Sequence, residues 1–453
     1  MLKAKLTQGP IGKHLLTMAL PMVVGLMANM SIQAVDMWFI SQLGQDALAA
    51  MGFIFPVTMV FLSLSIGLSA GAASVVARQL ANNDIPYLKR LITDTQTLAF
   101  CLALIAAILG WLTVDDLFSL LGAGPHLLPL IRDYIHIFYF NGLLTMLGMV
   151  ALSVVRATGN TRAQGMAMLL GAALNAVLDP LLIFGLWGFP RLEIQGAALA
   201  STAARLLSLC IAYYYLIGRL SLLTMPWVSI RRIWHSWRAV LHIALPAMGT
   251  NIIIPVSAAI ITALLAGFGE EAVAGMGVAQ RIEPLMLIAF YALSSVIGPF
   301  VGQNLGALEI KRIFKGVNIA STFALSYGAL LALFLWFFAE PIVALFSQDK
   351  TTLMIARDYL WIVPISYGCS GIVMTINASF NGIGKPMPAV VISALRVFIL
   401  YLPAAFAASH FYGVNGIFMA YTAVNIICAV LAYLWFRRVT WHASQALKAS
   451  SQA

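Results

Sequence analysis

Two groups of polar residues interrupt otherwise apolar stretches of this sequence. Asn29, Gln33 and Asp36 are spaced by four and three residues, which places them on one face of a helix. Asn175 and Asp179 are one helical turn apart. An apolar environment and a second carboxylate nearby both favour the protonated form of an acid. Asp36 and Asp179 are therefore candidates for a pair that takes up and releases a proton; their oxygens would also suit Na⁺.

Further polar side chains lie in apolar segments of the same half of the sequence. Tyr139, Asn141 and Thr202 could add oxygen and amide groups to the site. A charge in the bilayer core costs at least about 2.5 to 3.5 kcal/mol, so it needs a partner or a use. Arg205 is therefore expected to face a cavity or a partner, and it could contact the substrate or the acid pair. The alternative is that these groups only fix helix packing.

The composition identifies the elements that must position these residues. Of the 453 residues, 61% are hydrophobic and 9% are charged, whereas soluble domains have about 25% charged residues. Apolar stretches of about 20 residues, enough to cross a bilayer as a helix, recur along the whole chain. Residues 98–112 are apolar on all sides, which excludes the alternation of a β-barrel. The sequence predicts an all-α polytopic membrane protein.

Apolar runs between charged or Gly/Pro-rich breaks predict twelve transmembrane helices. The predicted spans are residues 14–40, 46–77, 91–114, 128–155, 163–187, 194–217, 239–266, 272–303, 314–339, 351–379, 387–410 and 414–436.

The distribution of charge predicts the orientation. The net charge is +10, and most Lys and Arg residues lie in alternate short segments, which indicates cytoplasmic loops. Both termini are therefore expected in the cytoplasm, in a cytoplasmic (inner) membrane. The positive charge is a topology signal, and no nucleic-acid partner is expected.

The sequence repeats at a shift of 225 residues. This shift places Ala19-Leu20-Pro21 on Ala244-Leu245-Pro246, and residues 43–52 on residues 268–277. We expect an N-lobe at 1–218, a cytoplasmic linker at 219–238 and a C-lobe at 239–453. Six helices in each half make the repeat parallel, so two six-helix bundles would surround a central cavity and rock about it, as in alternating access.

The two halves differ at the polar residues. At the 225-residue shift, the counterparts of Asn29, Gln33 and Asp36 are Ile254, Ala258 and Ile261. The polar helix face formed by Asn29, Gln33 and Asp36 thus belongs to the N-terminal half. In the C-terminal half, Glu283 is expected to be paired structurally.

Motifs for catalysis are missing from the sequence. It has no phosphate-binding Gly-rich loop ending in Lys-Ser/Thr, no HExxH helix and no Gly-x-Ser-x-Gly turn. The seven histidines show no metal-ligand spacing. We therefore expect no enzyme activity, no cofactor and no metal centre, and a transporter driven by an ion gradient.

Several of these residues resemble motifs of the multidrug and toxic compound extrusion (MATE) family. They are Ala19-Leu20-Pro21, Asp36, Gln79 and residues 156–160 (Arg-Ala-Thr-Gly-Asn). The N-lobe cluster is similar to that of the DinF-type branch. This resemblance implies that Asp36, Asp179, Asn175, Tyr139 and Thr202 bind the coupling cation, usually argued to be a proton, and that the first helix bends at Pro21.

The resemblance also implies the partners and the cycle. Proton uptake from outside would bend the first helix, alter a substrate cavity with Asn29, Gln33, Asn141 and Arg205 in its wall, and release an amphipathic, often cationic drug. Residues 246–266 and 359–379 hold no acid, unlike the sodium-coupled NorM-type branch. Sodium coupling at the N-lobe site and a lipid-linked sugar flippase remain the alternatives. The chain is expected to act as a monomer among membrane lipids, with a role in antibiotic resistance.

Overall fold

A computed structural model describes residues 4–82, 84–224, 229–346 and 349–450. The described residues form helices and no strand. The predicted linker, 219–238, is thus described except for residues 225–228.

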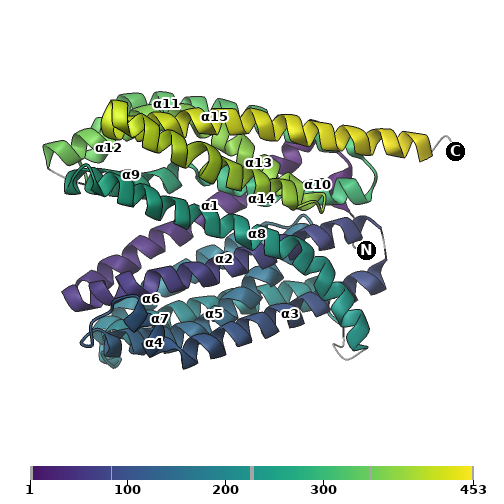
Figure 1. Cartoon of the computed structure of the whole chain (residues 1–453). Helices are drawn as coiled ribbons and strands as arrows, with labels where there is room; N and C mark the ends of the chain where they lie inside the picture. Colours follow the sequence, from purple (N-terminus) through teal and green to yellow (C-terminus); the bar gives the residue numbers. More distant parts are fainter. Residues whose placement is uncertain (1–3, 83, 225–228, 347–348, 451–453) are drawn as a thin grey trace. The chain divides into compact units, whose positions relative to one another are not determined.

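The first part of the chain contributes six membrane-spanning helical stretches. They are α1 (Ile11–Ser41), α2 (Gln45–Ala81), α3 (Ile85–Leu112), α5 (Leu128–Ala157), α6 (Arg162–Phe184) and α7 (Glu193–Tyr213), the last continued by the π-helical η3 (Tyr214–Arg219). Three short helices connect or precede them: η1 (Lys5–Thr7), α4 (Val114–Leu120) and η2 (Leu186–Gly188). Long helices of this part run alongside one another (Figure 1).

The second part contains more interrupted helices. They are α8 (Ile230–Ala266), α9 (Glu270–Met286), α10 (Ile288–Gly306), α11 (Ile310–Val343), α12 (Lys350–Ile362), η4 (Val363–Ser366), α13 (Tyr367–Gly382), α14 (Met387–Ala394), η5 (Leu395–Tyr401) and α15 (Leu402–Ser450).

The predicted twelve-helix membrane fold is confirmed. Eleven helical stretches in the described part of the chain are long and apolar enough to cross a membrane, and one of them, Met387–Trp441, has 55 residues. One crossing needs about 20 residues. The backbone of Gly413 interrupts this stretch with φ 60° and ψ −141°, so it supplies two crossings and the total is twelve.

Two predicted boundaries differ from the structure. The predicted span 272–303 is divided between α9 and α10 by a break at Leu287, shortly after Pro284, which cannot donate a helical hydrogen bond. α8 begins at Ile230 rather than at 239, because Arg231 and Arg232 interrupt the apolar run without ending the helix.

The chain forms two compact units. One consists mainly of Leu20–Met248, and the other combines Leu6–Ala19 with residues from Gly249 onward. The boundaries between the two units lie within α1 and α8, close to the repeated prolines Pro21 and Pro246. The lobe boundaries at 218 and 239, which follow the sequence repeat, stay a prediction.

Glycines bring three helices of the first unit close together. A Cβ atom added to Gly165 of α6 would lie 2.4 Å from the carbonyl oxygen of Pro21 in α1. One added to Gly25 of α1 would lie 3.0 Å from the Cα of Gly165, and one added to Gly171 of α6 would lie 3.0 Å from the Ser208 Oγ in α7. Small residues allow such close backbone approach in membrane helices. They position α1, α6 and α7 around the site described next.

Candidate functional site

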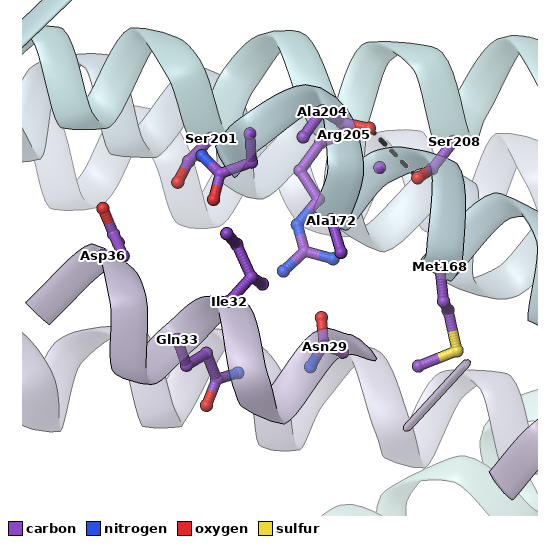
Figure 2. A pocket seen from close by; sticks show the side chains of 12 residues that line it. Asn29, Ile32, Gln33, Asp36, Met168, Ala172, Ser201, Ala204, Arg205 and Ser208 are labelled. Carbon is purple, nitrogen blue, oxygen red and sulfur yellow. Dashed lines mark hydrogen bonds between the residues drawn. The ribbon is translucent and has the colours of Figure 1, made fainter. Parts of the chain in front are cut away.

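A small polar cavity lies between α1, α6 and α7 of the first unit (Figure 2). Its volume is about 60 Å³, which is room for a few water molecules and far below the roughly 300 to 1,000 Å³ of pockets for drug-sized ligands. The lining residues are Asn29, Ile32, Gln33, Asp36, Met168, Gly171, Ala172, Asn175, Ser201, Ala204, Arg205 and Ser208. The cavity therefore suits an ion with its water rather than an organic substrate.

Both predicted carboxylates belong to this site. Asp36 lines the cavity, and its buried Oδ1 atom has no hydrogen-bond partner among the described residues. Asp179 is fully buried; its Oδ1 accepts a 3.1 Å hydrogen bond from the Nδ2 of Asn175, and its Oδ2 has no partner in the described part of the chain. Asn175 lines the cavity, so it connects Asp179 to this space. The two carboxylates are close enough to interact electrostatically.

Arg205 adds a permanent positive charge to the same cavity. Its side chain extends from α7 toward Asn29 of α1 (Figure 2). No described carboxylate lies within ion-pair distance of this guanidinium. A guanidinium stays charged in proteins, so the cavity combines acidic groups with one fixed cation.

Tyr134 of α5 is a site residue that the sequence did not single out. It is buried, and it interacts electrostatically with Asp36, Asp179 and Arg205. The sequence repeat could have pointed to Tyr134, because Arg132-Asp133-Tyr134 matches Arg357-Asp358-Tyr359 at the 225-residue shift. Ser201 and Ser208 were also missed, although each lies about one helical turn from Arg205.

Besides Asp179, three residues predicted for the cation site or the substrate cavity lie outside the cavity lining. The hydroxyl of Thr202 donates a 2.7 Å hydrogen bond to the carbonyl of Ala198 in its own helix. The Oδ1 of Asn141 accepts a 3.1 Å bond from the Thr145 hydroxyl. The ring of Tyr139 packs against Phe61, with centroids 5.8 Å apart. For these residues a functional role stays a prediction.

The second unit contains a half-buried carboxylate with a different environment. Glu283 of α9 accepts a 2.7 Å hydrogen bond from the hydroxyl of Tyr359 in α12. Tyr359 is the counterpart of Tyr134 in the sequence repeat. The repeated tyrosine thus satisfies a carboxylate oxygen in the second unit, whereas oxygens of Asp36 and Asp179 have no partner among the described residues of the first.

The fold and the site define a polytopic membrane protein whose pair of carboxylates, Asp36 and Asp179, lies in one half. The family model named MatE matches the chain twice, at residues 21–181 and 246–407. The two matches begin 225 residues apart, which is the shift of the sequence repeat. The chain belongs to the MatE family, and the resemblance to MATE transporters is confirmed.

Individual relatives support this assignment over almost the whole chain. A FAD transporter of Shewanella oneidensis is 39% identical and covers 96% of both chains. A probable multidrug resistance protein of Bacillus subtilis is 24% identical, over 91% of this chain and 89% of its own. The solved structure of the Vibrio cholerae MATE transporter VcmN in its bent form has a TM-score of 0.90 and 33% identity, covering 95% of this chain and 97% of that one.

Family membership settles the general activity. MATE transporters move small organic compounds and use ion gradients, and they are not enzymes. The chain is therefore a multi-pass membrane transporter of this kind.

Proposed function

We propose that this chain exports amphipathic, cationic organic compounds across the cytoplasmic membrane in exchange for protons. Asp36 and Asp179 carry the proton, and both termini face the cytoplasm. The chain works as a monomer of the DinF-type branch and contributes to antibiotic resistance. The observation that carries the proposal is the position of the two acids: oxygens of both are buried without a partner among the described residues, beside a cavity of about 60 Å³.

Proton transfer suits this geometry. A cavity of this size can hold water that connects Asp36 with the Asn175–Asp179 pair. Proton uptake removes one negative charge from the wall, which lowers the cost of closing apolar groups around it. Sodium binding would instead require several oxygen ligands around the ion. Because the same residues have oxygen atoms that could bind sodium, sodium coupling is the alternative to be tested.

Pro21 connects this charge change to the shape of α1. Proline has no N–H to donate to the carbonyl four residues earlier, so the helix can bend at this point. Gly165 lies against the carbonyl of Pro21, so a bend at Pro21 changes the packing of α1 on α6. Asn29 and Gln33 move with α1, and together with Arg205 and Asn141 they contribute to substrate release.

The experiment measures efflux from proteoliposomes loaded with ethidium, under a proton gradient and a sodium gradient applied separately. We expect the proton gradient alone to drive transport, and Asp36→Asn and Asp179→Asn to abolish it. Glu283→Gln is the matched control, because it neutralises a half-buried acid of the second unit. Full proton-driven efflux by Asp36→Asn would refute the proposal, and efflux driven by sodium alone would establish the alternative.

Flavin nucleotides are a second candidate substrate class. The relative called a FAD transporter is 39% identical to this chain, whereas a multidrug export protein of Staphylococcus aureus is 21% identical over 94% of both chains. The same proteoliposomes, loaded with FAD, test this candidate by the fluorescence of released flavin. Transport of FAD without transport of ethidium would replace the drug assignment and leave the role of the acids intact.

A further inference from the structure

We propose that Arg205 is a fixed counter-charge that limits the site to one monovalent coupling cation per transport cycle. This inference rests on the proposed function of Asp36 and Asp179. It concerns how many cations are exchanged for each substrate molecule, which the identity of the acids alone leaves open.

The charges around the cavity can be counted helix by helix in the described part of the first unit. α1 contributes Asp36, α6 contributes Asp179 and α7 contributes Arg205. The neighbouring α5 contributes the phenols of Tyr134 and Tyr139, which are uncharged at neutral pH. With both acids ionised the net charge is −1. One bound proton or Na⁺ makes it zero, and a second would make it +1.

A neutral site is the state favoured by the surroundings. The cavity lies between membrane helices, where a net charge of either sign is costly. The first cation removes the net charge, whereas the second would restore a charge of opposite sign. Loading therefore stops at one cation as long as Arg205 is present.

The position of Arg205 suits a counter-charge better than a helix-packing contact. Its guanidinium faces the cavity, and no described carboxylate is within ion-pair distance. It nevertheless shares the electrostatic environment of Asp36 and Asp179, because all three interact with Tyr134. An arginine locked in one ion pair would neutralise one acid permanently, whereas Arg205 lines the same cavity as Asp36 without forming an ion pair with a described carboxylate.

The sequence repeat gives independent support. Gly196 and Thr202 match Gly416 and Thr422 at a shift of 220, and the same shift places Asn425 at the position of Arg205. Asn425 is buried and donates a hydrogen bond to Ser366. The arginine thus occurs in the half that contains the carboxylate pair, and a neutral amide replaces it where Asp36 is replaced by Ile261.

The coupling ratio tests the proposal. The purified full chain is reconstituted in liposomes, and the ethidium gradient at which net transport stops is measured against a tenfold proton gradient with the membrane voltage set to zero. One proton per ethidium gives a limiting gradient of about tenfold, and two give about a hundredfold. We expect tenfold for the wild type and for Arg205→Lys, and a hundredfold for Arg205→Met.

Membrane voltage gives a second readout. Exchange of one proton for one ethidium ion moves no net charge, whereas exchange of two protons does. A potassium diffusion potential should therefore leave the limiting gradient of the wild type unchanged and shift that of Arg205→Met. Arg191→Met, which removes an exposed arginine paired with Glu193, is the matched control and should behave like the wild type.

A charge-balanced variant keeps the test decisive when Arg205→Met transports too slowly to measure. Asp179→Asn alone leaves the site with no net charge and so with no cation to bind, which is why it abolishes transport. Arg205→Met combined with Asp179→Asn returns the site to a net charge of −1 with Asp36 as the proton carrier, so this double variant should transport faster than Arg205→Met and couple one proton. A ratio of one for Arg205→Met, or no recovery in the double variant, overturns the counter-charge. Proton-driven efflux by Asp36→Asn would instead overturn the proposed function.

Discussion

Replacing Gly165 with alanine tests the contact between α1 and α6. The added Cβ would lie 2.4 Å from the carbonyl oxygen and 2.9 Å from the carbonyl carbon of Pro21. Carbon atoms attract one another at separations of about 3.5 to 4.0 Å, so α1 must move by roughly 1 Å at this point. Both neighbours are backbone atoms, which cannot rotate away as a flexible side chain can.

The energetic cost follows from two opposing effects. Forcing an additional methyl group into a packed contact costs about 1 to 3 kcal/mol. Alanine in a helix recovers about 0.5 to 1 kcal/mol relative to glycine. We therefore expect a net destabilisation of up to about 2.5 kcal/mol, together with altered transport because the contact lies at the proposed bend.

The assay combines thermal unfolding in detergent with ethidium efflux from proteoliposomes. Gly277→Ala in α9 is the matched control, because a Cβ at that position has no atom within 4 Å among the contacts described. We expect Gly165→Ala to unfold at a lower temperature and to transport more slowly than this control. Equal stability and equal transport in the two variants would refute the role of the close contact.

Two further predictions concern residues away from the cavity. Tyr359→Phe removes the hydrogen bond to Glu283. It should destabilise the protein by about 1.5 to 3 kcal/mol, the usual range for hydrogen bonds to charged groups. Thermal unfolding should show the lower stability, and efflux assays should show an unchanged requirement for protons. Arg132 donates hydrogen bonds to Asp115 in α4 and lowers the pKa of that carboxyl. The stabilisation by this ion pair is present above the unfolded-state pKa of Asp115, about 3.9, and is lost as the pH falls through the lower pKa of Asp115 in the folded protein. Asp115→Asn should therefore make thermal unfolding less sensitive to acid. An identical dependence on pH in the variant and the wild type would contradict the pairing.

The sequence was sufficient for the class of protein and the number of helices. Each crossing must bury about 20 apolar residues regardless of its neighbours, so local composition encodes it. The repeat and the confinement of Asp36 to one half are also properties of the sequence. The break at Leu287 was not predicted, because an apolar run continues across it.

Tertiary structure decided which polar side chains reach the cavity. Ser201 and Thr202 are adjacent and chemically alike, but one step along a helix rotates a side chain by about 100°, and only Ser201 lines the cavity. Tyr134 lies among the charged groups whereas Tyr139 packs against Phe61. Periodicity places residues on a face of their own helix, but the direction of that face depends on close contacts between helices, such as the approach of Gly165 to Pro21.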